Sequence, residues 1–198
     1  MEEKRVYLLA QFDEATERRL TAMYGELIGA GYSGKQTPCV PYHFTLDSFE
    51  VEKELEVLER AREVCRRASA FDINLSYIGL FGLKVLFVAP SMNAELLGLH
   101  DALIPEEQAS GCHNWVIHAT LLIDEADAIQ TAASIIAQSF SPFPAKIESI
   151  GVYEFFPTRF IENLRLNRQF RAWKMGRRVR CTLDISRNLW IVYHPSTG

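Results

Sequence analysis

The sequence has little that would mark a membrane, secreted or low-complexity protein. Among 198 residues there are only 11 glycines, 8 prolines and 4 cysteines, which excludes a collagen-like, disordered or disulfide-stapled chain. No apolar run approaches the roughly 20 residues of a membrane-spanning helix. The first apolar run, 6–10, is too short for a signal peptide and follows an acidic start. We therefore expect a cytoplasmic protein without membrane association, folded as one domain or as two small lobes that share a core.

The sequence also lacks a recognisable metal-binding pattern. None of the four cysteines lies in a C-x-x-C pair: Cys39, Cys65, Cys112 and Cys181. Structural zinc needs four ligands at regular spacing, so a zinc site built from His43, His118 and a cysteine is the weakest alternative, and we expect no metal or cofactor. His100 lies within a helical pattern, and we expect it on the surface.

The net charge is small but unevenly distributed, since the value of −4 averages two opposite segments. Residues 1–157 hold 12 Lys or Arg against 23 Asp or Glu, whereas residues 158–198 hold 9 against 2. We therefore divide the chain into an acidic body, 1–157, and a basic C-terminal extension, 158–198. A structural role for the extension, as a helix plus a hairpin with strands over 177–185 and 189–194, is favoured over a segment that binds RNA phosphates and bases.

Hydrophobic periodicity predicts alternating strands and helices in the body. Apolar runs rich in β-branched and aromatic residues predict strands over 6–12, 41–46, 71–78, 84–89, 115–123 and 146–156. Helical spacing predicts helices over 13–29, 51–70, 91–109 and 124–140. The segment from Gly79 to Gly82 is interpreted as a hairpin turn. Short hairpin connections favour a mixed or antiparallel sheet, and hence an α+β fold, over a doubly wound parallel one.

Two of the predicted strands carry the same motif about 75 residues apart. The segments are Val-Pro-Tyr-His-Phe-Thr-Leu at 40–46 and Trp-Val-Ile-His-Ala-Thr-Leu at 115–121. Because side chains alternate along a strand, His43 and Thr45 project from one face, as do His118 and Thr120. Each strand thus offers an imidazole beside a hydroxyl, with apolar residues on its other face. A chance origin for two such copies in matching contexts is improbable, which favours function.

The paired His-x-Thr-Leu motifs resemble the two-histidine (2H) phosphoesterases, specifically the 2′-5′ RNA ligases and cyclic phosphodiesterases. The resemblance covers residues 5 to about 157 and includes the 6–12, 31–36 and 154–157 segments. It implies an α+β fold of two pseudo-symmetric lobes, whose antiparallel sheets are flanked by helices around a central cleft. One motif from each lobe would line that cleft. The sequence departs from several ligase-like members at 122–124, Leu-Ile-Asp, where those carry a basic residue.

Two histidines and two threonines suit phosphodiester chemistry. A histidine can act as base or acid near neutral pH, and two close imidazoles favour one neutral and one protonated form. The hydroxyls of Thr45 and Thr120 can hold the non-bridging phosphate oxygens. Which of His43 and His118 is the base stays open at this point. Arg159 and Phe156 are the substrate contacts that we expect near the end of the body, with Arg159 at a phosphate.

The leading hypothesis is a metal-independent phosphoesterase that acts on a 2′,3′-cyclic phosphate or a 2′-5′ phosphodiester. Its partners would be RNA ends or small cyclic nucleotides, and the same site could run in reverse as an RNA ligase. We expect a monomer. The alternative is a non-catalytic nucleotide- or RNA-binding module that uses the same cleft.

Overall fold

The body folds as two successive β-α-β-α-β units. The computed structural model describes residues 3–104 and 115–167, together with the backbone of two short strands at 180–184 and 189–193. The first unit contains β1 (Arg5–Phe12), α1 (Glu14–Gly29), β2 (His43–Glu50), α2 (Glu54–Arg67) and β3 (Phe71–Phe81), with a short 3-10 helix, Val51–Lys53, before α2. The second contains β4 (Val85–Pro90), α3 (Ala94–Leu103), β5 (Ala119–Ile123), α4 (Ala126–Ser139) and β6 (Phe143–Phe155).

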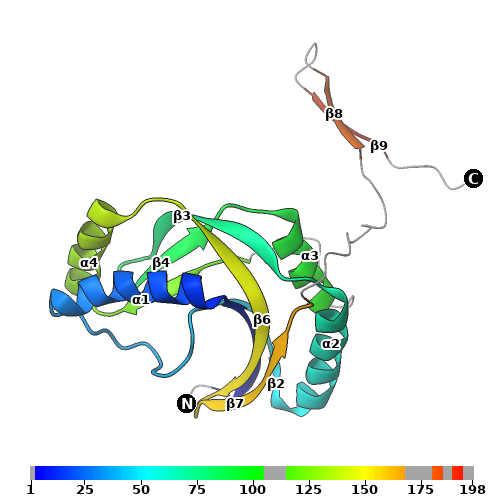
Figure 1. Ribbon diagram of the computed structural model, residues 1–198, viewed down its shortest axis with the longest axis horizontal. Helices are drawn as coiled ribbons and strands as arrows, with labels where there is room; N and C mark the ends of the chain where they lie inside the picture. Colours follow the sequence, from blue (N-terminus) through cyan, green and yellow to red (C-terminus); the bar gives the residue numbers. More distant parts are fainter. Residues whose placement is uncertain (1–2, 105–114, 168–179, 185–188, 194–198) are drawn as a thin grey trace, which may run out of the picture.

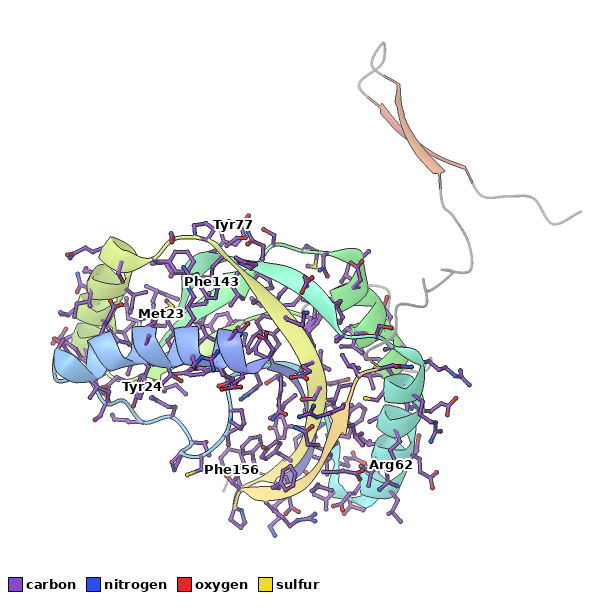
Figure 2. The ribbon with its side chains drawn as sticks, viewed as in Figure 1. Met23, Tyr24, Arg62, Tyr77, Phe143 and Phe156 are labelled. Carbon is purple, nitrogen blue, oxygen red and sulfur yellow. The ribbon has the colours of Figure 1, made fainter. Side chains whose placement is uncertain are left out.

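All strands of the body form one seven-stranded antiparallel sheet in which the two units exchange their last strands. The order is β2-β1-β6-β3-β4-β5, and β7 (Arg159–Arg165) pairs with β6. Residues 147–155 of β6 pair with β1, and residues 143–147 pair with β3. We call β2, β1, β7 and the end of β6 the first half-sheet, and β5, β4, β3 and the start of β6 the second half-sheet. Figure 2 marks the two ends of β6 by Phe143 and by Phe156, which follows it.

The helices cover the sheet in two pairs. Helix α2 packs against α3 and the first half-sheet, whereas α1 packs against α4 and the second (Figure 1). The buried side chains beneath them, such as Leu8, Phe44, Leu121 and Ile150, form a continuous apolar core. We call this side of the sheet the helix face. The opposite side, which carries His43, Thr45, His118 and Thr120 by strand alternation, is the motif face.

Local sequence explains the first helix, which leads from β1 to the motif strand β2. The carboxylate of Asp13 caps α1 by accepting from the Thr16 amide at 3.1 Å, and Leu20, Met23 and Leu27 form its buried stripe. The helix ends at Gly29, and Gly31 takes a φ of +92°, a conformation that favours glycine.

The predicted order of elements and the antiparallel α+β architecture are confirmed. The predicted boundaries shift at the motifs, because β2 begins at His43 and β5 begins only after His118. The turn expected at 79–82 was placed too early: Gly79 lies inside β3, where it pairs with Phe87 of β4. The surface position expected for His100 is wrong, because its side chain is buried, with 4% of its surface exposed.

The sheet continues beyond residue 157, where the basic extension was expected to begin. Strand β7 pairs with β6 from Ser149 to Glu154, so residues 159–165 belong to the sheet of the body. The expected hairpin is present as β8 (Arg180–Asp184) and β9 (Leu189–Tyr193), which form a separate two-stranded sheet. The expected helix falls on residues outside the described part. Within the described residues, no helix is both long and apolar enough to cross a membrane.

Candidate active site

The structure brings the two motifs together although they lie at opposite ends of the sheet order. Strand β2 contacts β5, and the charge of His118 acts on the titration of His43. A direct bond also joins the two segments, since the indole Nε1–H of Trp115 donates to the main-chain carbonyl of Thr45 at 2.8 Å. The four motif side chains are all partly exposed. The sheet therefore curls until its two motif strands are neighbours.

Both motif histidines are held by the same hydrogen bond. The Nδ1 atom of His43 lies 2.7 Å from the carbonyl oxygen of Pro41, and Nδ1 of His118 lies 2.8 Å from that of Val116. A carbonyl can only accept, so each Nδ1 carries the proton and donates. This arrangement fixes the neutral tautomer and orients the ring. It makes Nε2 the atom that can take up or release a proton in each histidine.

Each half also contains a row of three residues that lie opposite one another on neighbouring strands, and the two rows correspond. In the first half-sheet, Thr45 of β2 is opposite Leu9 of β1, which is opposite Gly151 of β6. In the second, Thr120 of β5 is opposite Phe87 of β4, which is opposite Gly79 of β3. Each motif threonine thus has a buried apolar neighbour and, one strand further, a glycine.

His43 has polar neighbours, but its burial disfavours its charge. It is opposite Gln11 of β1, whose side-chain oxygen accepts from Ser149 and Asn163. Burial lowers the pKa of His43, the bond to the Pro41 carbonyl opposes this change, and the charge of His118 lowers the pKa further. His43 is therefore held in its neutral form near neutral pH.

His118 lies in an aromatic environment instead. Its ring is 4.6 Å from that of Phe81 at an interplanar angle of 89°, and 5.2 Å from that of Phe87. The two phenyl rings also contact each other, with centroids 4.5 Å apart. Phe87 is buried, whereas 37% of Phe81 is exposed beside the histidine. The second half-sheet thus positions its histidine by packing against rings.

Sequence analysis missed the link that Trp115 makes between the halves. The indole stacks on the imidazole of His100 from α3, with ring centroids 3.8 Å apart and an interplanar angle of 15°. The stacking covers one face of the imidazole, and His100 also lies on the buried stripe of α3 with Leu96, Leu99 and Leu103. The tryptophan stands at the first position of the second motif, but its partner Thr45 is 70 residues away. Only the fold shows that they meet.

A carboxyl group on α1 lies behind the first motif. Burial raises the pKa of Glu17 to about 7, while a hydrogen bond from the backbone amide of Tyr42 opposes the shift. Its Oε1 is buried without a hydrogen-bond partner among the described residues. Burial, together with the charge of Glu17, also raises the pKa of the Tyr42 hydroxyl. Glu17 thus contacts the residue that precedes His43.

The two expected substrate contacts lie in different surroundings. The guanidinium of Arg159 donates to Glu154 at 2.7 and 2.8 Å and also pairs with Glu54 at the start of α2. Two carboxylates thus compete for the charge that was expected at a phosphate. Phe156 is 46% exposed and adjoins an aromatic cluster that contains Tyr7, Tyr153, Phe155 and Phe160.

A basic side chain does lie at the end of β5, but it comes from the loop before the first motif. The amide of Lys35 donates to the carbonyl of Ile123 at 2.7 Å, and its ammonium pairs with Glu125 and lies 4.0 Å from Asp124. Loop 31–36, part of the family resemblance, therefore runs along the free edge of the second motif strand.

A cavity of about 460 Å³ lies away from the motifs, between α2 and β7, and none of its lining residues is a motif residue. Across residues 3–104 and 115–167, no group of three or more His, Cys, Asp or Glu side chains is arranged to hold a metal ion.

Comparison with known proteins places this arrangement in a family. A family model described as the 2′-5′ RNA ligase superfamily matches residues 12–155. The apo structure of E. coli LigT is similar with a TM-score of 0.58 at 15% identity, over 84% of this chain and 99% of LigT. LigT complexed with 3′-AMP is similar with a TM-score of 0.55 at 17% identity, over 84% of this chain and 99% of LigT. The protein TT0787 of Thermus thermophilus is similar with a TM-score of 0.56 at 15% identity, over 82% of this chain and 97% of TT0787. At these identities the structures show the shared fold. No curated protein matches the sequence.

Proposed function

The chain belongs to the 2′-5′ RNA ligase superfamily, and from that premise we propose that it is a metal-independent phosphoesterase. Its substrate would be a 2′,3′-cyclic phosphate or a 2′-5′ phosphodiester, at an RNA end or in a small nucleotide. The observation that carries the proposal is the matched pair of histidines, each held through Nδ1 by the carbonyl two residues before it. That geometry leaves two Nε2 atoms for proton transfer, one from each half.

We assign the base to His43 and the acid to His118. Two close imidazoles hold one proton more readily than two, and burial disfavours placing that proton on His43. In hydrolysis, Nε2 of His43 takes a proton from water as the water oxygen bonds to phosphorus. Nε2–H of His118 gives its proton to the ribose oxygen as the phosphorus–oxygen bond breaks. Exchange of one proton through solvent restores the starting state. Ligation uses the same two proton transfers when the 5′-hydroxyl of a second RNA, instead of water, bonds to phosphorus and the ribose oxygen of the cyclic phosphate leaves.

The threonines and the aromatic cluster would bind the rest of the substrate. The hydroxyls of Thr45 and Thr120 donate to the non-bridging oxygens, where negative charge develops. The exposed ring of Phe156 can stack on a base, an interaction that tolerates any base. That LigT has been solved with 3′-AMP and with ATP supports a nucleotide substrate. An Arg159–phosphate contact would need the arginine to leave Glu54 and Glu154, so it is the weaker of the two expected contacts.

The proposal is tested by turnover of 2′,3′-cyclic nucleotides and of short RNAs ending in a cyclic phosphate, with EDTA present. The wild type should hydrolyse at least one of them, and His118→Ala should lower kcat by about 10²- to 10⁴-fold while the unfolding temperature is retained. Turnover that EDTA abolishes would refute the metal-independent mechanism. Binding without turnover on every substrate would favour the non-catalytic nucleotide-binding module instead. Gel filtration of the same sample tests the expected monomer.

A further inference from the structure

A glycine in the second half-sheet lies under one of the rings that pack on His118. Gly79 of β3 is directly opposite Phe87 of β4. A Cβ atom built on Gly79 would lie 2.5 Å from both Cε2 and Cζ of Phe87. Carbon atoms in van der Waals contact are about 3.5–4.0 Å apart, so the ring and a side chain at position 79 cannot occupy this space together.

The ring of Phe87 cannot move away without disturbing the histidine. Only 7% of Phe87 is exposed, and its ring contacts those of Phe81 and His118, with centroid distances of 4.5 Å and 5.2 Å. Both of those rings lie on the motif face. Any side chain at position 79 would therefore press Phe87 against the rings that hold the imidazole.

We propose that Gly79 is a positioning residue for His118. By carrying no side chain, it makes room for Phe87 and thereby fixes the ring against which the catalytic imidazole packs. The inference that this position matters for turnover rests on the proposed function of His118. The packing of Phe87 between Gly79 and His118 does not depend on that function.

The first half-sheet repeats the arrangement with different side chains. Gly151 stands where Gly79 stands in the second, and a Cβ there would lie 2.5 Å from Nε2 of Gln11. Gln11 is directly opposite His43. In each half, a glycine two strands away from the motif threonine thus makes room for a side chain beside the motif histidine, but the geometry differs. Phe87 is directly opposite Gly79, whereas Leu9 is opposite Gly151, and the space at Gly151 is taken by Gln11 and by Tyr153, whose Cε2 would lie 2.8 Å from the added Cβ. The two glycines stand at equivalent positions, and each leaves space for a neighbour of its motif histidine.

The first test measures turnover of Gly79→Ala against a matched control, Gly98→Ala. Gly98 lies in α3, and a Cβ there would have nothing within 4 Å. We expect kcat of Gly79→Ala to fall about 10- to 100-fold with a smaller change in KM, because a displacement of about 1 Å can cost as much as 100-fold. Gly98→Ala should keep the wild-type kcat. A wild-type kcat for Gly79→Ala would overturn the proposal.

The second test follows His118 directly by NMR, independently of activity. Phenyl rings shift the resonances of a neighbouring imidazole, so Gly79→Ala should move the ring-proton signals of His118 and leave those of His43 in place. The same substitution made in a Phe87→Leu background should move them little and should cost little further kcat. Leu is the residue at the equivalent place in the first half-sheet, Leu9.

The outcomes separate the two proposals. If Gly79→Ala shifts the His118 ring-proton signals equally in the wild-type and Phe87→Leu backgrounds, or shifts them in neither, the proposed role of Gly79 is refuted. If Gly79→Ala alone does not fold, Phe87→Leu should restore folding, and failure to do so would also refute it. A shift of His118 that depends on Phe87, in a protein that turns over no tested substrate, would support the packing relation and count against the proposed function alone.

Discussion

The two half-sheets repeat one backbone arrangement and surround it with different side chains. In both, a histidine donates through Nδ1 to the carbonyl two residues before it, and a threonine two residues later heads a row that ends in glycine. Around His43, however, the neighbours include an amide and a carboxyl-bearing helix, whereas two phenyl rings contact His118. The repeated backbone orients both histidines in the same way, through Nδ1, so that Nε2 is the atom that exchanges protons in each. The differing neighbours can give the two histidines different protonation states.

Removal of either histidine is the most severe test of this equivalence. We expect His43→Ala and His118→Ala each to lower kcat by about 10²- to 10⁴-fold, because each removes one of two obligatory proton transfers. The double variant should be little worse than either single one, since groups that act as a unit are not additive. The measurement is steady-state hydrolysis of a cyclic nucleotide, with unfolding temperature as the control for folding. Substantial activity in one single variant would show that only one half is catalytic.

The threonines test whether both halves hold the phosphate. Thr45→Val and Thr120→Val keep the side-chain shape but remove a donor to a charged oxygen, which is worth about 1.5–3 kcal/mol. We therefore expect kcat/KM to fall about 10- to 100-fold in each. Thr131→Val on the exposed surface of α4 serves as the control and should have no effect. A loss in only one of the two motif variants would assign the phosphate oxygens to one half.

The difference between the histidines should be visible in the pH dependence. Because burial and the charge of His118 lower the pKa of His43, the acidic limb of kcat/KM should lie below the usual histidine value of about 6.5. His118→Gln removes the repulsive charge, so the pKa of His43 should rise, as an NMR titration of its ring protons can measure. The lowered pKa of His43 also affects the free energy of unfolding. Above about pH 6.5 the histidine is neutral in both the folded and the unfolded state, so it costs no stability. As pH falls below that value, the unfolded histidine binds a proton more readily than the folded one, and the free energy of unfolding decreases. An unchanged His43 titration in His118→Gln would refute the electrostatic coupling between the halves.

The smallest expected effect concerns Glu17, which lies beside the first motif. Its folded pKa of about 7 exceeds the ordinary glutamate value of 4.5, so the ionised carboxylate destabilises the fold as pH rises through 7. Glu17→Gln should therefore raise the free energy of unfolding at pH 8, by roughly 1 kcal/mol after allowance for solvent screening, and should change it little at pH 4. Urea unfolding at the two pH values measures the difference. Equal effects at both would show that the carboxyl is not the cause.

Sequence patterns predict the local part of this structure well. Periodicity predicts every helix and strand of the two β-α-β-α-β units, and alternation places His43 with Thr45, and His118 with Thr120, on common faces. These features depend on residues a few positions apart, where spacing determines geometry.

The features that sequence reasoning missed are contacts between distant residues. Trp115 bonds to Thr45, and Arg159 pairs with Glu54 more than 100 residues away. The imidazole of His100 stacks on a ring that comes from outside its own helix. The importance of Gly79 depends on its neighbour across a strand pair, and the glycine alone indicates a turn. One sequence contains no signal for such pairings, because they are set by which strands become neighbours.

Strand β6 has a consequence for how the chain is made. It lies between β1 and β3, so Arg5 finds its partner Phe155 only after nearly the whole body has been synthesised. Until then β1 and β3 each present an open edge to which other chains can add. Pairings so distant in sequence also close slowly. A nascent chain that lacks 143–155 therefore has both motifs but lacks the strand that pairs with both half-sheets. The open edges of β1 and β3 are covered only when β6 pairs with both strands.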